Sequence, residues 1–341
     1  MTCREIISRR LNHEGTETTP YTIGFEPGIS QALAEYYKDE HWQRKKLKKY
    51  TCCYLSADTV LMEDIDGVYS KDAWGALWRN DKQPSRLERP SLPGPYFSGF
   101  AFPTSETFVA NILRQKEQAI KDYNSNTEQY RVIHMGWGIF EHSWRMRGFE
   151  NALVDMIEEP DFYRELTRKI TNIYIDMLKA CADVPNDAYI FGDDWGEQRG
   201  LIMGRERWRE FLKPCWARIY AEVHRQGKKV VQHSCGSIVD LYDDLAEIGM
   251  DCHESVQPEA RGMAPEALKE KYGGKVSFWG CLGSQGLLFS GTPAAIKAEV
   301  FRLHHLFKED GGFILMPAKP LQDGMAIERA VAAVEAFQAL G

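Results

Sequence analysis

The sequence of 341 residues has no apolar run of about 18 residues, so nothing in it reads as a transmembrane helix. It also lacks an excess of positive charge. Its 42 basic and 49 acidic residues give a net charge of -7, which argues against a large nucleic-acid interface. Residues 1–11 do not contain the apolar core of a signal peptide. We therefore expect a cytoplasmic protein that binds neither membrane nor nucleic acid.

The eight cysteines form no CxxC pair and no regular framework. In a large cytoplasmic chain such cysteines are reduced thiols, and most of them pack as small apolar side chains. Cys235, Cys252 and Cys281 differ from the rest because each lies at the end of an apparent strand. No internal repeat and no low-complexity segment is present, and we expect a single domain over residues 1–341.

Short apolar segments alternate with helical patterns along the chain, most regularly after residue 187. This alternation predicts parallel strands with right-handed crossovers and favours a (β/α)8 TIM barrel with an N-terminal embellishment. An open doubly wound sheet is the alternative. Residues 58–105 are proline-rich and read as an irregular excursion, with at most a hairpin, that could cover an active site. The eight expected strands are residues 20–28, 52–55, 131–138, 188–196, 229–234, 250–254, 276–280 and 312–316.

Chemically active side chains follow several of these strands. In a barrel such positions meet at one mouth, at the carboxyl ends of the strands. His233 and Cys235 are good metal ligands with Cys281 as a third candidate, although a buried histidine beside an inert thiol remains the alternative. The expected catalytic residues are Glu26, Asp193, Asp194, His233 and Lys319, and the expected substrate-binding residues are Tyr54, His134, Trp137, Phe140, Trp195 and Gln198.

Four segments of the second half resemble the uroporphyrinogen decarboxylase superfamily, which includes corrinoid-dependent methyltransferases. They are residues 141–155, Gly-Asp-Asp-Trp-Gly-Glu-Gln at 192–198, His-Ser-Cys-Gly at 233–236 and Gly-Gly-Phe-Ile-Leu at 311–315. The resemblance extends over roughly residues 106–340 and is weak before them. It implies a TIM barrel, with the active site at the mouth described above.

This sequence differs from the family pattern at two places, and these differences help to distinguish between the activities known in the family. Decarboxylases hold the many carboxylates of a porphyrinogen with an N-terminal Arg-Gln-Ala-Gly-Arg segment, whereas the first strand here ends in Glu26. Thiol-methylating members hold zinc with His-x-Cys and a cysteine in a Pro-Gly-Cys segment. The matching segment here is Met-Pro-Ala-Lys-Pro at 316–320, which places Lys319 at the third ligand position.

The resemblance then implies the first methyltransferase of an O-demethylase system. Such an enzyme takes a methyl group from an aryl methyl ether and passes it to the Co(I) corrinoid of a separate protein, with zinc as a possible second cofactor. Residues 251–256 begin like a corrinoid-binding motif but lack its glycine, so the corrinoid is expected on the partner. The alternatives are a uroporphyrinogen-type decarboxylase and a methylcobamide:thiol methyltransferase.

Overall fold

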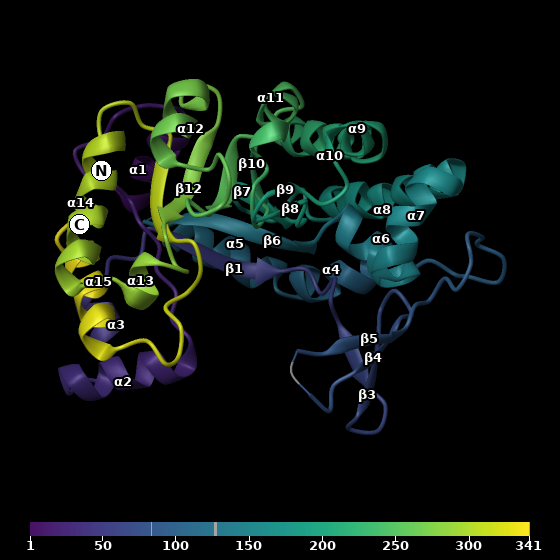
Figure 1. The fold of residues 1–341 in the computed structure, drawn as a ribbon, viewed down its shortest axis with the longest axis horizontal. Helices are drawn as coiled ribbons and strands as arrows, with labels where there is room; N and C mark the ends of the chain where they lie inside the picture. The colour runs from purple at the N-terminus through teal and green to yellow at the C-terminus, as the bar shows by residue number, and fades with distance from the viewer. Residues whose placement is uncertain (83, 126–127, 341) are drawn as a thin grey trace.

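The computed structural model describes residues 1–82, 84–125 and 128–340, except for the side chains of residues 54, 124 and 125. A seven-stranded parallel sheet curls through the middle of the molecule, in the order β1-β6-β7-β10-β11-β12-β13 (Figure 1). Its strands are β1 (Thr51–Ser56), β6 (Tyr130–Trp137), β7 (Ala188–Gly192), β10 (Lys229–His233), β11 (Cys252–Val256), β12 (Ser277–Leu282) and β13 (Phe313–Pro317).

The sheet confirms seven of the eight expected strands, but the described residues do not confirm a complete barrel. Residues 20–28 make only two isolated parallel bridges to the chain around β13, from Tyr21 to Leu315 and from Phe25 to Leu321. On the opposite edge, β1 is the last strand of the sheet and pairs with β6. The expected first strand therefore lies beside the sheet as an extended segment. Pro20 and Pro27 bound it, and proline cannot donate a ladder hydrogen bond.

The strands of the curled sheet are apolar because helices and neighbouring strands bury both of their faces. All six residues of β12 are buried, and β10 contains the buried pair Val230 and Val231. One hydrophobic cluster continues from α1 through the sheet to the last helix. The described helices include none that is both long enough and apolar enough to cross a membrane.

The helices alternate with the strands as expected. Helices α6 and α7 are separated at Gly148, which has a φ of 85° that favours glycine. The helices are α1 (Cys3–Leu11), α2 (Pro27–Tyr37), α3 (Trp42–Lys46), α4 (Ser105–Arg114), α5 (Lys116–Ser125), α6 (Ile139–Arg147), α7 (Phe149–Glu158), α8 (Pro160–Ala180), α9 (Arg205–Arg207), α10 (Lys213–Arg225), α11 (Tyr242–Glu247), α12 (Pro265–Tyr272), α13 (Leu287–Ser290), α14 (Pro293–Phe307) and α15 (Ile327–Gln338). A π-helical turn, Trp208–Leu212, joins α9 to α10, and a 3-10 turn, Val239–Leu241, precedes α11.

The excursion at 58–105 is more regular than predicted, although residues 90–104 form no helix or strand. It contains a four-stranded antiparallel sheet, which projects from the curled sheet near α4 in Figure 1. Its strands are only three or four residues long, too short to show a clear alternating pattern in the sequence. They are β2 (Met62–Asp64), β3 (Tyr69–Asp72), β4 (Leu77–Arg79) and β5 (Arg86–Arg89). A further two-stranded hairpin pairs β8 (Gly196–Glu197) with β9 (Gly200–Leu201).

The excursion packs against α6, the helix that follows β6. The Trp74 ring stacks on His142 with their centroids 4.3 Å apart. The Arg147 guanidinium, at the end of α6, donates a 2.6 Å hydrogen bond to the carbonyl oxygen of Leu92. These contacts hold the antiparallel sheet next to the carboxyl end of β6. Whether it covers a substrate there remains a prediction.

Asp244 of α11 forms a buried group of ion pairs whose contribution to the stability of the fold depends on pH. Its side chain is 1% exposed and forms ion pairs with Arg205, Arg209 and Lys213. Burial raises the pKa of this carboxyl, but the hydrogen bonds from Lys213, Arg209 and Arg205 outweigh burial and lower the pKa to about 2. A carboxyl with a depressed folded-state pKa stabilises the protein above its unfolded pKa of about 4.

We expect this contribution, roughly 2 kcal/mol, to be fully present above about pH 4 and to be lost as the pH falls towards about 2. Urea unfolding between these pH values measures it, with Asp244→Asn as the comparison. The variant should be less stable at neutral pH and should lose less stability on acidification. An equal loss in both proteins would contradict this role for Asp244.

Candidate functional site

Three potential metal ligands meet at the carboxyl ends of β7 and β10. They are Asp194, His233 and Cys235, and one ligand atom from each lies within 4.8 Å of the other two. His233 Nε2 is 3.5 Å from Cys235 Sγ and 3.6 Å from Asp194 Oδ1. The side chains of His233 and Asp194 are 32% and 38% exposed, so the group is open to solvent. The structure thus brings together three of the residues predicted from the sequence.

A carboxylate on the next strand orients the histidine. His233 in β10 pairs in register with Glu254 in β11, and His233 Nδ1 lies 2.6 Å from Glu254 Oε2. Burial alone lowers the pKa of His233, but the Glu254 carboxylate and Cys235 outweigh it, so the pKa lies well above its ordinary value. A carboxylate on one ring nitrogen fixes the imidazole and leaves Nε2 directed at the group, as in many metal sites.

Backbone contacts position the cysteine. The Cys235 N–H donates to Asp194 Oδ1 at 2.7 Å, and the Trp195 N–H donates to Ser234 Oγ at 3.0 Å. Gly236 then turns the chain with a φ of 75°, and its N–H donates to Gln257 Oε1 at 3.0 Å. The turn after the His-x-Cys pair therefore requires glycine, as the sequence indicates.

Gly236→Ala is expected to destabilise the fold by about 2–5 kcal/mol and to disturb the site. A Cβ at this position would lie 2.7 Å from the Gly196 carbonyl carbon and 2.8 Å from Glu197 backbone atoms, in a conformation that disfavours side chains. Thermal unfolding and metal titration of the variant measure both effects. Gly204→Ala is the control, because Gly204 has a similar φ of 77° and open space around it. Equal losses in the two variants would show that the close approach is unimportant.

Lys319 reaches the same group from the chain after β13. It is exposed, and its Nζ donates towards Cys235 Sγ across 3.7 Å. The family pattern places a cysteine ligand where Lys319 stands, and the structure brings the lysine to the expected position.

Asp193, the second predicted acid, is fully buried rather than exposed at the mouth. It accepts hydrogen bonds from the backbone N–H groups of Phe140 and Glu141 at the start of α6, and from the indole N–H groups of Trp195 and Trp216. Burial raises its pKa to about 7, against the opposing effect of these four donors. This geometry suits a residue that positions α6 and the chain after β7 rather than one that contacts a substrate.

Glu141 is an acid that the sequence reading did not select. Burial, followed by the charges of Asp193 and Asp194, raises its pKa to about 8. It is therefore protonated at neutral pH and can donate a proton. Its only sequence signal was its place at the start of the 141–155 segment, and the burial that raises its pKa comes from the tertiary fold.

A guanidinium and an indole form one wall beside this acid. The Arg145 guanidinium carbon lies 3.3 Å from the ring centroid of Trp137, a predicted substrate-binding residue at the end of β6. Trp137 is partly exposed, whereas Arg145 is buried and also lies over Trp78 of the antiparallel sheet. His134, three residues before Trp137 in β6, is partly buried and accepts a hydrogen bond from the Gly136 N–H at 3.0 Å.

Several of the predicted substrate-binding and catalytic residues do not face the group at His233. Phe140 and Trp195 are 1% and 0% exposed and belong to the core, where Phe140 packs against Phe149 and Trp195 packs against Trp208 and Trp216. Gln198 is exposed in the turn between β8 and β9. Glu26 accepts a 2.7 Å hydrogen bond from the Asp323 N–H and so ties the N-terminal segment to the chain after β13. The side chain of Tyr54 lies outside the described residues.

Cys281 does not join the group, contrary to the prediction that it is the third ligand. It is fully buried in β12, and burial raises the pKa of its thiol well above the ordinary value. Among the described residues, Asp194 takes the third position instead. The register explains the difference, because His233 pairs with Gly192 and the chain just after β7 therefore lies next to the His-x-Cys pair.

The donor set fits a zinc ion. Imidazole nitrogen, thiolate sulfur and carboxylate oxygen are the ligands that zinc takes, and catalytic zinc sites have three protein ligands and one open position. Asp194, His233 and Cys235 supply these three donors, and Glu254 supplies the hydrogen bond that typically orients a ligating histidine. The arrangement can hold a Lewis acid at a solvent-accessible position beside two further proton donors, Lys319 and Glu141.

The sequence profile of the uroporphyrinogen decarboxylase (URO-D) family matches residues 135–340, more than half of the chain. The chain belongs to this family. It is 29% identical over 122 residues to the uroporphyrinogen decarboxylases of two Bacillus cereus strains, B4264 and ATCC 14579. Those matches span 34% of this chain and 34% of each relative, about a third of their length.

A solved structure shares the fold over nearly the whole chain. It is a methyltransferase from Methanosarcina mazei, with a TM-score of 0.72, 18% sequence identity and 99% of each chain covered. The chain therefore shares its mixed α/β fold, with the curled parallel sheet, with that methyltransferase. The sequence resemblance to the superfamily is confirmed.

Proposed function

We propose that this protein is a corrinoid-protein-dependent methyltransferase that demethylates aryl methyl ethers and methylates the Co(I) corrinoid of a separate protein. The observation that carries the proposal is the group of Asp194, His233 and Cys235, with Lys319 directed at the thiol. The likeness of the fold to a methyltransferase supports a methyl-transfer reaction. Trp137 and its stacked Arg145 provide a flat surface beside the group for an aromatic substrate.

The reaction is a displacement at the methyl carbon. The electron pair of Co(I) forms the new bond to carbon, the carbon–oxygen bond breaks, and its electron pair stays on the phenolate. Phenolate is a poor leaving group, so a proton delivered to the ether oxygen is expected to accelerate the step by about 10²–10⁴-fold. Glu141, with a pKa raised to about 8 by burial and by Asp193 and Asp194, is one suitable donor, and Lys319 is a second.

Asp194, His233 and Cys235 would hold the zinc ion, and Glu254 would keep His233 in position. Bound there, zinc would supply a Lewis acid that draws electron density from the ether oxygen. The residues of this chain orient the substrate and deliver the proton. Asp193 contributes indirectly, because it fixes the first turn of α6 from which Glu141 projects.

The charges around the group disfavour the decarboxylase alternative. Asp194 and Glu254 are carboxylates at the site, with Lys319 as a nearby exposed cation. A porphyrinogen with eight carboxylates needs several arginines, and these acids would repel it. The thiol methyltransferase alternative differs in both the methyl donor, a methylcorrinoid, and the acceptor, a thiol, so an assay with each pair of reactants separates the two.

The decisive test is methyl transfer by the purified protein under anaerobic conditions. With a Co(I) corrinoid protein and a panel of methoxyarenes, we expect the absorbance of methyl-cobalt to appear and the matching phenol to form in equal amount. Methylcorrinoid with a thiol serves as the second arm. Loss of methyl-cobalt with formation of a thioether, and no demethylation of any methoxyarene, would overturn the proposal in favour of the thiol methyltransferase.

A further inference from the structure

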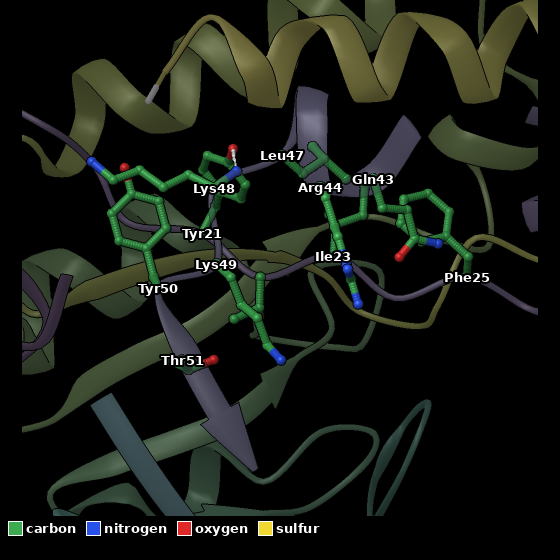
Figure 2. Close-up of a pocket in the computed structure, with 11 residues that line it drawn as sticks. Tyr21, Ile23, Phe25, Gln43, Arg44, Leu47, Lys48, Lys49, Tyr50 and Thr51 are labelled. Atoms are coloured by element: carbon green, nitrogen blue, oxygen red, sulfur yellow. Dashed lines mark hydrogen bonds between the residues drawn. The ribbon is translucent and has the colours of Figure 1, made fainter. Parts of the chain in front are cut away.

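A cavity of about 410 Å³ lies where the curled sheet fails to close. On one side is the extended segment around Tyr21 and Ile23, which is bridged to β13, and on the other is the start of β1, which is paired with β6. Helix α3 forms the third side. Figure 2 shows the side chains of the residues that line this cavity.

The charge of this cavity differs from that of the chain as a whole. Arg44, Lys48 and Lys49 line it, and its eleven lining residues include no acid, although the net charge of the protein is -7. None of the three cations forms an ion pair with a residue in the described ranges, whereas the neighbouring Lys45 pairs with Asp39. Unpaired like charges around one space repel each other, and an anion bound between them would relieve this repulsion.

The cations are not equivalent. The Lys48 ammonium lies over the Tyr50 ring, 5.1 Å from its centroid. In Figure 2 the charged ends of Arg44 and Lys49 extend towards the same side of the pocket, and the Lys48 side chain runs along Tyr50 instead. Arginine presents a planar fork that matches a carboxylate or phosphate, and lysine adds a second charge.

The remaining walls are apolar and aromatic. Tyr21, Phe25, Leu47 and Tyr50 line the cavity, and the Tyr50 hydroxyl is buried with no hydrogen-bond partner among the described residues. The volume is within the range of small-ligand pockets, about 300–1,000 Å³. An occupant therefore needs one anionic group and a flat apolar body.

We propose that this cavity is a second binding site, for a small organic anion that carries a carboxylate beside an apolar ring. Arg44 and Lys49 bind the carboxylate, and the partly exposed side chains of Phe25 and Leu47 contact the ring. The site is separate from the group at His233 and goes beyond the proposed methyl transfer.

Calorimetric titration with benzoate, benzamide and inorganic phosphate tests the site. We expect saturable binding of benzoate, weaker binding of phosphate and none of neutral benzamide. Arg44→Gln/Lys49→Gln should weaken benzoate binding by about tenfold or more, because it removes two charge-assisted hydrogen bonds. Lys45→Gln/Lys46→Gln, which changes the same net charge in the same segment, should leave benzoate affinity unchanged.

An aryl carboxylate could also enter the site at His233, so the variant His233→Ala/Cys235→Ala is titrated in parallel. Retained benzoate affinity in that variant supports the cavity as the binding site. Benzoate affinity that survives Arg44→Gln/Lys49→Gln, or no saturable binding of benzoate at millimolar concentrations, would overturn the proposal. Binding of phosphate alone would overturn the assignment of an organic anion.

Discussion

Replacing both His233 and Cys235 with alanine is expected to remove bound zinc and to lower methyl transfer by about 10³-fold or more. These two residues supply two of the three donor atoms within 4.8 Å of one another, so Asp194 alone remains. A single carboxylate cannot hold zinc against its hydration in water. Elemental analysis of the chelator-free protein gives the zinc content, and the rate of methyl-cobalt formation gives the activity.

Cys3→Ala is the matched control, because Cys3 is a thiol in α1, outside the group. It should keep both the zinc and the rate. Zinc below one equivalent in the unaltered protein, unchanged in the double variant, would refute the metal site. Loss of zinc with unchanged methyl transfer would refute only the role of zinc in the reaction. Glu141 and Lys319 would then have to activate the ether oxygen without a metal.

Asp155→Ala is expected to destabilise the protein by about 3–5 kcal/mol, because it leaves a buried guanidinium without its partner. The Arg147 and Asp155 side chains are each 5% exposed and are joined by two hydrogen bonds, of 2.6 and 3.1 Å. Arg147 also donates to the Leu92 carbonyl oxygen at 2.6 Å. The pair therefore links α6 and α7 to the excursion that contains the antiparallel sheet.

Asp161→Ala is the comparison, since Asp161 pairs with Arg164 at 2.7 Å with its side chain 99% exposed. Exposed pairs contribute only about 0–1 kcal/mol. Urea unfolding of both variants gives the two free energies. Similar small losses would mean that Arg147 finds another partner or water after the substitution.

The strands and the His-x-Cys motif could be predicted from the sequence because both are local signals. Val230 and Val231 form an apolar run, and His233, Cys235 and Gly236 follow it directly. The antiparallel sheet was missed because strands as short as Leu77–Arg79 have no readable period. Closure of the barrel could not be predicted either, because it depends on whether the two edges pair, a long-range event.

The sequence by itself determined the parallel α/β architecture, the family and the types of side chain that follow the strands. Apolar periodicity and motif spacing depend only on residues that are close in the chain. Only the tertiary structure decided which strand ends meet. The register of β7 against β10 brought Asp194 to His233, and the interior position of β12 kept Cys281 away. Burial beside Asp193 likewise raised the pKa of Glu141, because desolvation depends on neighbours that are distant in the chain.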